Sequence, residues 1–252
     1  MKSTLSQPAL DMIEHYAHLK IDGKTVRCPY FNNKRNRVRG ALGVHIGKGR
    51  PEDIEHEVQI LAMKQHKQLS ALTATDITEL MVDNNIGIDC SGFVYHVLNA
   101  QRHGALRKSI ALSATNPFRK LIGKLRTAEN VNVQVFANEK NSKSIALKDA
   151  APGDIIAMLG TGEKHDLDHM LLVSEVEYNE QNEPTKIAYV HSLRWRTDAK
   201  YGHGIKFGSI RIIDASKGLL DQSWTEDGHI DEKNETLWRA KTAEKLEVRR
   251  IR

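Results

Sequence analysis

The spacing of apolar residues changes near residue 150, and this change limits the kind of fold that the chain can form. Four segments before it carry apolar residues at helical intervals: 7–19, 51–69, 75–82 and 89–103. Four segments after it are short apolar runs bounded by glycine or polar residues, as in strands: 155–159, 168–176, 186–193 and 204–213. Helices followed by consecutive strands predict an α+β fold with an antiparallel sheet.

Two other stretches carry weaker patterns. A short basic helix is predicted after Asn116, and the alternation of Val131, Val133 and Val135 predicts a strand. In the tail from Trp238, the loose alternation suits either a last strand that closes the sheet or a terminal helix. Both alternatives stay open for the tail.

Length and composition are those of a globular protein with a large core. The chain has 252 residues, of which 40% are hydrophobic and 27% charged, with only 6 prolines. A formal net charge of +5 favours acidic partners such as nucleic acid, cell-wall polymers or anionic lipid, without choosing among them. Residues 1–19 lack the apolar stretch of a secretion signal, and no later run is long enough to span a bilayer. We therefore expect a cytoplasmic protein, and export by a route without such a signal stays open.

The cysteine and histidine spacings do not favour a metal. Cys28 and Cys90 occur without a CxxC or Cys/His finger spacing, so neither a disulfide framework nor a structural zinc site is predicted. A single bridge between these two cysteines stays open. His165 and His169 lie four residues apart with acidic residues between them, which suits a metal site on a helix. Because the sequence after Asp168 predicts a strand instead, we expect no metal and no other cofactor there.

Cys90 begins one of the predicted helices. Asp89 before it is a suitable N-cap, because its side chain can accept a bond from an amide of the first turn. An apolar helical face follows, made of Phe93, Val94, Val97 and Leu98. A thiol at a helix start can have its pKa lowered from about 8.5 into roughly the 3.5–7.5 range, which makes it reactive. The same pattern also suits a small buried thiol that only packs, so both interpretations stay open.

The predicted strands supply two histidines that could serve a thiolate nucleophile. Such a nucleophile needs a base within hydrogen-bonding distance and a third group that orients the base. His169 stands at the head of the strand at 168–176, and His191 stands near the end of the strand at 186–193. If these strands are adjacent and antiparallel, the two imidazoles meet at one edge of the sheet. A helix packed across that edge would then present Cys90 to His169.

Several short motifs, in this order, resemble the NlpC/P60 family of papain-like cysteine peptidases and amidases. They are Asp89-Cys90-Ser91-Gly92-Phe93-Val94, Pro152-Gly153-Asp154-Ile155-Ile156, His169 opening an apolar strand, and His191-Ser192 closing the next strand. Upstream, Cys28-Pro29-Tyr30 resembles the Pro-Tyr that precedes the nucleophile in the family. The resemblance covers roughly residues 26–31, 86–100 and 150–195.

The resemblance implies a papain-like core in which the helix that carries the nucleophile packs on an antiparallel sheet, with a helical N-terminal insert. It implies that Cys90 is the nucleophile, His169 the general base and then acid, and His191 the residue that orients it. In family members that cut cell-wall peptides, the matching tyrosine and the residues flanking the nucleophile also help to hold the substrate's free amine. The expected oxyanion and substrate-binding residues are therefore Tyr30, Asp89 and Ser91.

One NlpC/P60-like domain over residues 1–252 follows from the resemblance. Within it we expect an N-terminal helix at 1–25, a helical insert at 45–85, a catalytic core at 86–104 and 150–215, an elaboration at 105–150 and a C-terminal extension at 216–252. The insert comes just before the nucleophile, and we expect it to set specificity. The chain departs from the family at Phe31-Asn32-Asn33, where a Gly-Gly is usual, and in the long gap that follows.

The expected activity is hydrolysis of an amide bond in a peptidoglycan-derived or related peptide, through an acyl-enzyme on a Cys-His-His triad. Acyl or amide transfer on the same fold is one alternative, because the same triad supports it where water is excluded. Another alternative is a binding module for nucleic acid or a different anionic polymer, with a catalytically inactive Cys90. Its binding surface would be the basic cluster Lys34, Arg35, Arg37 and Arg39.

Overall fold

The computed structural model describes residues 1–33, 42–112, 123 and 125–252 of the chain. N-terminal helices pack on a large antiparallel sheet, so the predicted α+β class is confirmed. Two predictions fall outside the described residues: the basic cluster Lys34, Arg35, Arg37 and Arg39, and the helix after Asn116.

Most of the α-helices lie before residue 140 of the chain. The α-helices are α1 Gln7–Ala17, α2 Pro51–Lys64, α3 Ala74–Asp83, α4 Cys90–Gln101, α5 Leu106–Ser109, α7 Thr127–Asn130, α8 Val133–Ala137 and α9 Glu235–Lys241. Short 3-10 helices are η1 Gly43–Ile46, η2 Leu69–Ala71, η3 Leu147–Asp149, η4 Leu219–Asp221 and η5 Asp231–Lys233. Among the described residues, no helix has both the length and the apolar character that crossing a membrane requires.

The strands form one large sheet and one small hairpin. The hairpin is β2 Leu19–Ile21 with β3 Lys24–Val26. The main sheet contains β1 Lys2–Thr4, β4 Ser142–Ile145, β5 Ile155–Thr161, β6 Leu167–Tyr178, β7 Pro184–Leu193, β8 Gly204–Arg211, β9 Ser223–Glu226, β10 His229–Ile230 and β11 Lys245–Ile251. Its order is β10-β9-β8-β7-β6-β5-β11-β4, and β1 pairs with the end of β6. The four strands predicted from the sequence are thus confirmed as β5 to β8, each antiparallel to the next.

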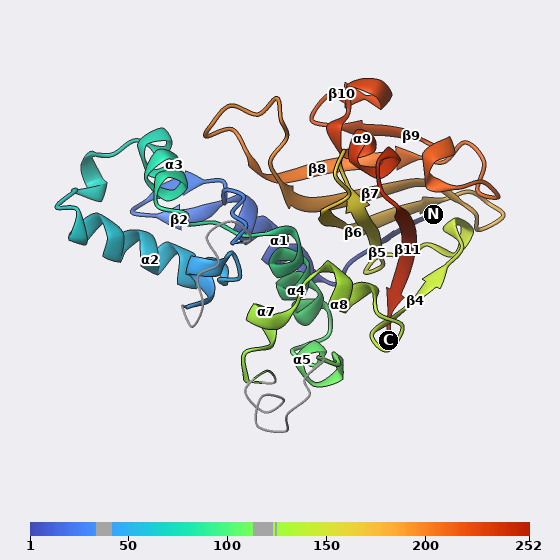
Figure 1. Ribbon diagram of the computed structural model, residues 1–252, viewed down its shortest axis with the longest axis horizontal. Coiled ribbons are helices and arrows are strands. Elements are labelled where there is room, and N and C mark those ends of the chain that lie inside the picture. The colour runs from blue at the N-terminus through green and yellow to red at the C-terminus, as the bar shows by residue number, and fades with distance from the viewer. Residues whose placement is uncertain (34–41, 113–122, 124) are drawn as a thin grey trace.

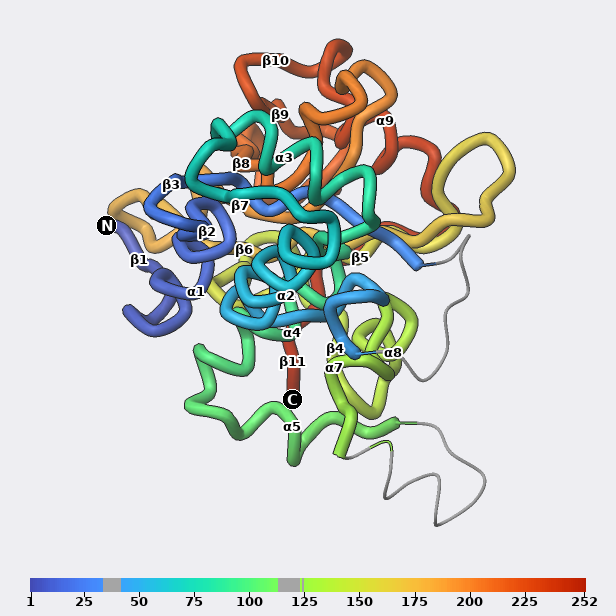
Figure 2. Tube along the Cα trace, turned by 90° about the vertical axis from the view of Figure 1, so that its left-hand side faces the viewer, coloured from blue at the N-terminus to red at the C-terminus, as the bar shows by residue number. Residues whose placement is uncertain are grey.

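The main sheet is buried on both faces, which explains the continuous apolar runs in its central strands. Along β6, Met170 and Leu172 belong to the core shared with α1 to α4, whereas Leu171 and Val173 belong to a second core that includes α9. Figure 1 shows α2, α3 and the hairpin on one side, the sheet on the other, and α1 and α4 between them. In Figure 2, which views the helical side, α2 and α4 lie in front of the sheet. Helix α4 packs on β6 and β7.

Local hydrogen bonds explain where the predicted elements differ from the observed ones. Helix α2 ends at Lys64, five residues early, and α3 begins at Ala74 because Thr73 and Asp76 cap it reciprocally. The strand predicted from Val131, Val133 and Val135 is wrong, because this segment forms α8. Asn132 Oδ1 accepts a hydrogen bond from the amide of Val135 at 2.8 Å and so begins a helix.

Both alternatives left open for the tail are found. Helix α9 is followed by β11, which pairs with β5 on one side and β4 on the other. The segment 216–252 also contributes β9 and β10, which extend the opposite edge of the same sheet. The predicted C-terminal extension is therefore part of the main sheet, and it pairs with β5 and β8, which flank the two strands that carry the candidate catalytic histidines.

Candidate active site

Cys90 is the first residue of α4, and its position is fixed by the residues before it. The side chain of Asp89 caps the helix, since its Oδ1 accepts from the amide of Gly92 at 2.6 Å. Ile88 is held from the sheet side, because Ser192 Oγ on β7 donates to its carbonyl oxygen at 2.8 Å. The predicted N-cap at Asp89 is confirmed, and the amino end of α4 is anchored to the end of β7.

The two strand histidines form a chain of hydrogen bonds with a buried carboxylate. Strands β6 and β7 are adjacent and antiparallel, as the meeting of the two imidazoles requires. His169 Nε2 lies 2.8 Å from His191 Nδ1, and His191 Nε2 lies 3.1 Å from Oε2 of Glu226 on β9. All three side chains are almost completely buried. Glu226 was not among the residues predicted from the sequence.

Glu226 is held as a carboxylate by three donors. Besides His191, Tyr189 Oη donates to its Oε2 at 2.8 Å and Thr236 Oγ1 donates to its Oε1 at 3.1 Å. Burial alone would raise the pKa of Glu226, but the charge on His191 and these hydrogen bonds outweigh burial and lower the pKa. Gly208 on β8 leaves room for Tyr189 to reach Glu226, because a Cβ at position 208 would overlap the Tyr189 ring.

The carboxylate sets the direction of the hydrogen bonds. An ionised carboxylate only accepts, so Nε2 of His191 carries a proton toward Glu226. When the His191 ring is neutral, its Nδ1 is an acceptor, and Nε2 of His169 donates to it. This leaves Nδ1 of His169 with a free lone pair. Burial, followed by the charges on His191 and Arg239, holds the pKa of His169 well below its usual range, so this ring is neutral at pH 7.

The thiol of Cys90 is also neutral at pH 7. It is only 5% exposed, and burial first and the Asp89 carboxylate second raise its pKa to about 12. Three neighbours lower this pKa without overcoming burial: Lys48, the backbone amide of Met170 and Arg239. Of the two interpretations left open by the sequence, the lowered pKa of a helix-start thiol is not found, because desolvation of the thiolate exceeds the stabilisation that the helix end supplies.

The neighbours of Cys90 place it beside the head of β6. The amide that acts on its sulfur belongs to Met170, which directly follows His169 in the chain. The charge of Arg239 on α9 acts on both the Cys90 thiol and the His169 ring, and its guanidinium donates to Thr161 Oγ1 at 3.4 Å. The structure thus brings the predicted nucleophile and the predicted base into one region, with Arg239 as a shared cationic neighbour.

Lys48 is the third charged residue that acts on Cys90, besides Asp89 and Arg239. Its Nζ donates to Asp89 Oδ1 at 2.8 Å and to Ser91 Oγ at 2.5 Å, and its side chain is 7% exposed. Ser91 Oγ also donates to Asp89 Oδ1 at 3.0 Å. The two predicted substrate-binding residues Asp89 and Ser91 therefore already hold an ammonium group, which comes from the protein itself.

Tyr30 reaches the same region. An isolated parallel bridge joins it to Ile88, and its backbone amide donates to His203 Nδ1 at 3.2 Å. Burial, and then the charge that Cys90 carries when it is ionised, raise the pKa of the Tyr30 hydroxyl, so this hydroxyl lies near the thiol. Its Oη accepts from Asn32 Nδ2 at 3.0 Å. His203 is itself buried.

The structure also tests the disulfide and the metal site considered from the sequence. Cys28 and Cys90 are both free thiols, so the bridge left open by the sequence is absent. His165 Nδ1 bonds to the carbonyl oxygen of Gly160, whereas His169 bonds to His191. Within the part of the chain that the structure describes, no three or more His, Cys, Asp or Glu side chains converge as metal ligands would.

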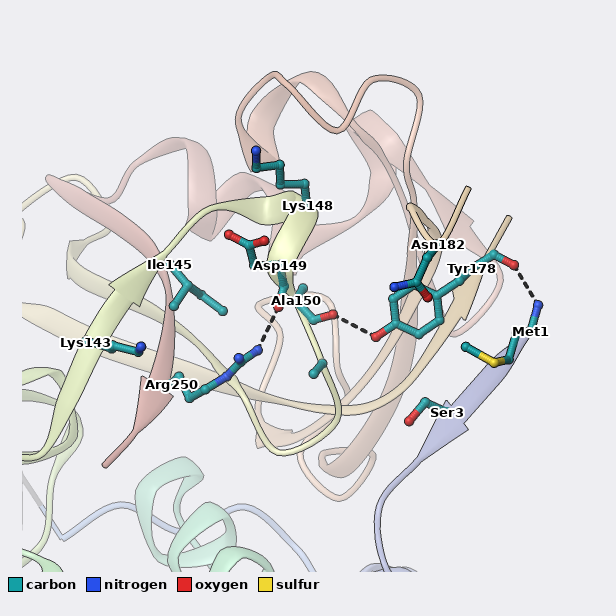
Figure 3. Close-up of a pocket in the computed structure, with 11 residues that line it drawn as sticks. Met1, Ser3, Lys143, Ile145, Lys148, Asp149, Ala150, Tyr178, Asn182 and Arg250 are labelled. Atoms are coloured by element: carbon teal, nitrogen blue, oxygen red, sulfur yellow. Dashed lines mark hydrogen bonds between the residues drawn. The ribbon is translucent and has the colours of Figure 1, made fainter. Parts of the chain in front are cut away.

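A pocket of about 580 Å³ lies near the amino terminus of the chain. It is lined by residues of β1, β4, η3, β6 and β11 (Figure 3). Its polar groups bond to one another: Tyr178 Oη donates to the carbonyl oxygen of Ala150 at 2.9 Å, and Arg250 Nη2 donates to that of Asp149 at 2.7 Å. None of the lining residues belongs to the region around Cys90. We assign no function to this pocket.

Three residues of the site were missed in the sequence. Glu226 follows Trp224 with strand alternation, so an acid on the apolar face was a usable signal. Lys48 stands in a glycine-rich run at 43–49, and Arg239 stands on a helix capped by Asn234. Neither carries a local signal that points to Cys90. In three comparisons, no family model, no curated protein and no solved structure matched the chain.

Proposed function

We propose that the protein is a thiol hydrolase of the NlpC/P60 type that cleaves an amide bond in a peptidoglycan-derived or related peptide. The observation that carries this proposal is the chain of hydrogen bonds His169–His191–Glu226, which starts at the head of β6 beside Cys90. A nucleophile, a base and a group that orients the base are the parts that acyl transfer through a thioester needs. The proposal includes a papain-like core, which is supported by the motifs at 89–94, 152–156, 169 and 191–192.

The reaction begins from a neutral pair. As Cys90 Sγ attacks the amide carbonyl, its proton passes to Nδ1 of His169, and the resulting imidazolium is stabilised through His191 by the Glu226 carboxylate. The proton then moves from His169 to the leaving amine, which departs and leaves a thioester on Cys90. Water attacks the thioester with His169 as base, releases the acid and restores the thiol. The backbone amide of Cys90 and the hydroxyl of Tyr30 are the donors proposed for the oxyanion.

Acyl or amide transfer is the second candidate, and the burial of Cys90 favours it. At 5% exposure the thiol has little contact with water, and a thioester formed there would last longer in the absence of water. An amine or alcohol acceptor that enters the site would then compete with hydrolysis. Both reactions use the same residues, so only the products distinguish them.

The test is to expose the protein to a panel of muropeptides and short peptides, with and without added amine acceptors, and to identify products by mass spectrometry. Hydrolysis predicts fragments with a new carboxyl group, whereas transfer predicts acceptor adducts. Cys90→Ala should abolish both products. Cys28→Ala is the matched control, because Cys28 is also free and buried, and its thiol donates to the carbonyl oxygen of Pro29 at 3.7 Å. Turnover that survives Cys90→Ala would overturn the proposal.

A further inference from the structure

The ammonium of Lys48 sits in a site made by Asp89 and Ser91, one on each side of the nucleophile in the sequence. Its hydrogen bond of 2.8 Å to Asp89 Oδ1 has the length of a charge-assisted bond, and its Nζ also donates to Ser91 Oγ at 2.5 Å. We call these two oxygens the amine site. The occupant shows what the amine site accepts, namely a primary ammonium that donates to a carboxylate and a hydroxyl.

The protein holds Lys48 in the amine site by more than this ion pair. The backbone of Lys48 forms an antiparallel bridge with Ile88, and its carbonyl oxygen accepts from His96 Nε2 at 2.9 Å. Gly92 gives the side chain its path, because a Cβ there would come within 2.9 Å of Lys48 Cδ. Lys48 is therefore packed against the first turn of α4, unlike a surface lysine with many accessible conformers.

An occupied amine site excludes a second cation. The single carboxylate at the amine site is already neutralised by Lys48, so an incoming ammonium would meet a like charge at short distance and find no free acceptor of opposite charge. The other charged side chain acting on Cys90 is Arg239, which is also cationic. Both cations near the thiol, Lys48 and Arg239, thus disfavour a free amine on the acyl donor.

We propose that Lys48 is a specificity-determining residue, and that the acyl donor is a peptide segment without a free amine at the amine site, such as an N-acylated or internal segment. This inference rests on the proposed function, because it assigns a substrate class to the same site. Removing the Lys48 side chain leaves Asp89 and Ser91 in place and vacates the position of its ammonium. The variant then accepts the free amine that the native protein excludes.

The test measures binding without turnover, in a Cys90→Ala background. Alanine amide carries a free amine and N-acetylalanine amide does not, and both are titrated by NMR into the background protein and into its Lys48→Ala derivative. We expect Lys48→Ala to raise the affinity for alanine amide at least tenfold, with no gain for the acetylated probe. Lys206→Ala is the matched control, since Lys206 is as buried and is paired with Asp198 and Asp227. No gain for alanine amide, or an equal gain in the control, would overturn the proposal.

A second variant covers the case in which Lys48→Ala does not fold because Asp89 is left unpaired. Lys48→Gln keeps a hydrogen-bond donor on a side chain one atom shorter and is titrated with the same two probes. In addition, Lys48→Ala is refolded with ethylammonium or with tetramethylammonium, which carries the same charge but no donor. Recovery with ethylammonium alone supports the amine site, and equal recovery or none contradicts it. Failure of the proposed function would show instead as turnover retained in Cys90→Ala, which leaves the binding result unchanged.

Discussion

The two cysteines of this protein are both buried, but their polar and charged neighbours differ. Both are free, and burial is the first cause that raises the pKa of each thiol. At Cys28, the influence that opposes burial among the described residues is the backbone amide of Ile88, which lowers the pKa. At Cys90, charged groups act in both directions, and the head of β6 brings a histidine chain beside the sulfur. Burial therefore does not separate a packing thiol from a nucleophile; the polar neighbours do.

The largest expected difference between the two cysteines is in turnover. Cys90→Ala removes the nucleophile and should lower kcat by at least about 10³-fold, whereas Cys28→Ala should leave kcat within about threefold. Both variants should show native circular dichroism, since each change removes one sulfur atom from a packed site. Equal losses in the two variants would mean that the comparison reflects packing alone.

The next largest effect is expected from removing the charge of Glu226, which is linked to the Cys90 site through His191 and His169. Glu226→Gln removes the charge that stabilises the imidazolium, and its amide nitrogen can turn the His191 ring to the wrong tautomer. We expect kcat to fall by about 10²-fold. Tyr189→Phe is the control, because it removes one hydrogen bond to Glu226 but leaves the carboxylate and His191 in place. A loss in Tyr189→Phe as large as that in Glu226→Gln would contradict the assigned role of the charge.

A smaller effect sharpens the comparison of the thiols themselves. Because the pKa of Cys90 is about 12, its alkylation by iodoacetamide should rise about tenfold per pH unit from pH 7 to pH 10 without a plateau. Arg239→Gln removes a charge that lowers this pKa and should slow alkylation several-fold at each pH. Peptide mass mapping separates modification of Cys90 from that of Cys28. A plateau below pH 8 would indicate a resting thiolate–imidazolium pair.

The smallest expected effect is on stability in acid. The pKa of His169 is lowered in the folded state, so below about pH 6.5 the unfolded state binds the additional proton. The free energy of unfolding should therefore fall as the pH drops from 7 to 5, and His169→Gln should flatten this slope. His96, also buried with a lowered pKa on α4, is the control. His96→Gln should flatten the slope as well, but only His169→Gln should also reduce turnover. An unchanged slope in His169→Gln would contradict the neutral imidazole.

Strand and helix periodicity was enough to predict the parts of the site that lie on regular elements. The cap at Asp89 and the apolar face after it predicted α4, and two apolar runs predicted the adjacent strands that bring His169 and His191 together. The reactive state of the thiol could not be predicted, because the pKa of Cys90 depends on burial by distant segments. The local helix end alone gives the wrong direction.

Residues that join the site through long-range contacts escaped prediction. Glu226 reaches His191 across β8, where Gly208 leaves room for the Tyr189 ring, whose hydroxyl donates to the same carboxylate. Lys48 reaches Asp89 from a loop some forty residues earlier in the chain. The strand predicted at 131–135 was wrong because of a local contact. One capping residue, Asn132, outweighs the strand preference of the valines.

The central claim is that Cys90 forms a covalent acyl intermediate that depends on His169. Its most direct test is peptide mass mapping of protein quenched in acid during turnover of the muropeptide panel. We predict an acyl group on the peptide that contains Cys90, none on the peptide that contains Cys28, and none at either site in His169→Gln. Turnover without an adduct on Cys90, or an adduct on Cys28, would contradict the claim.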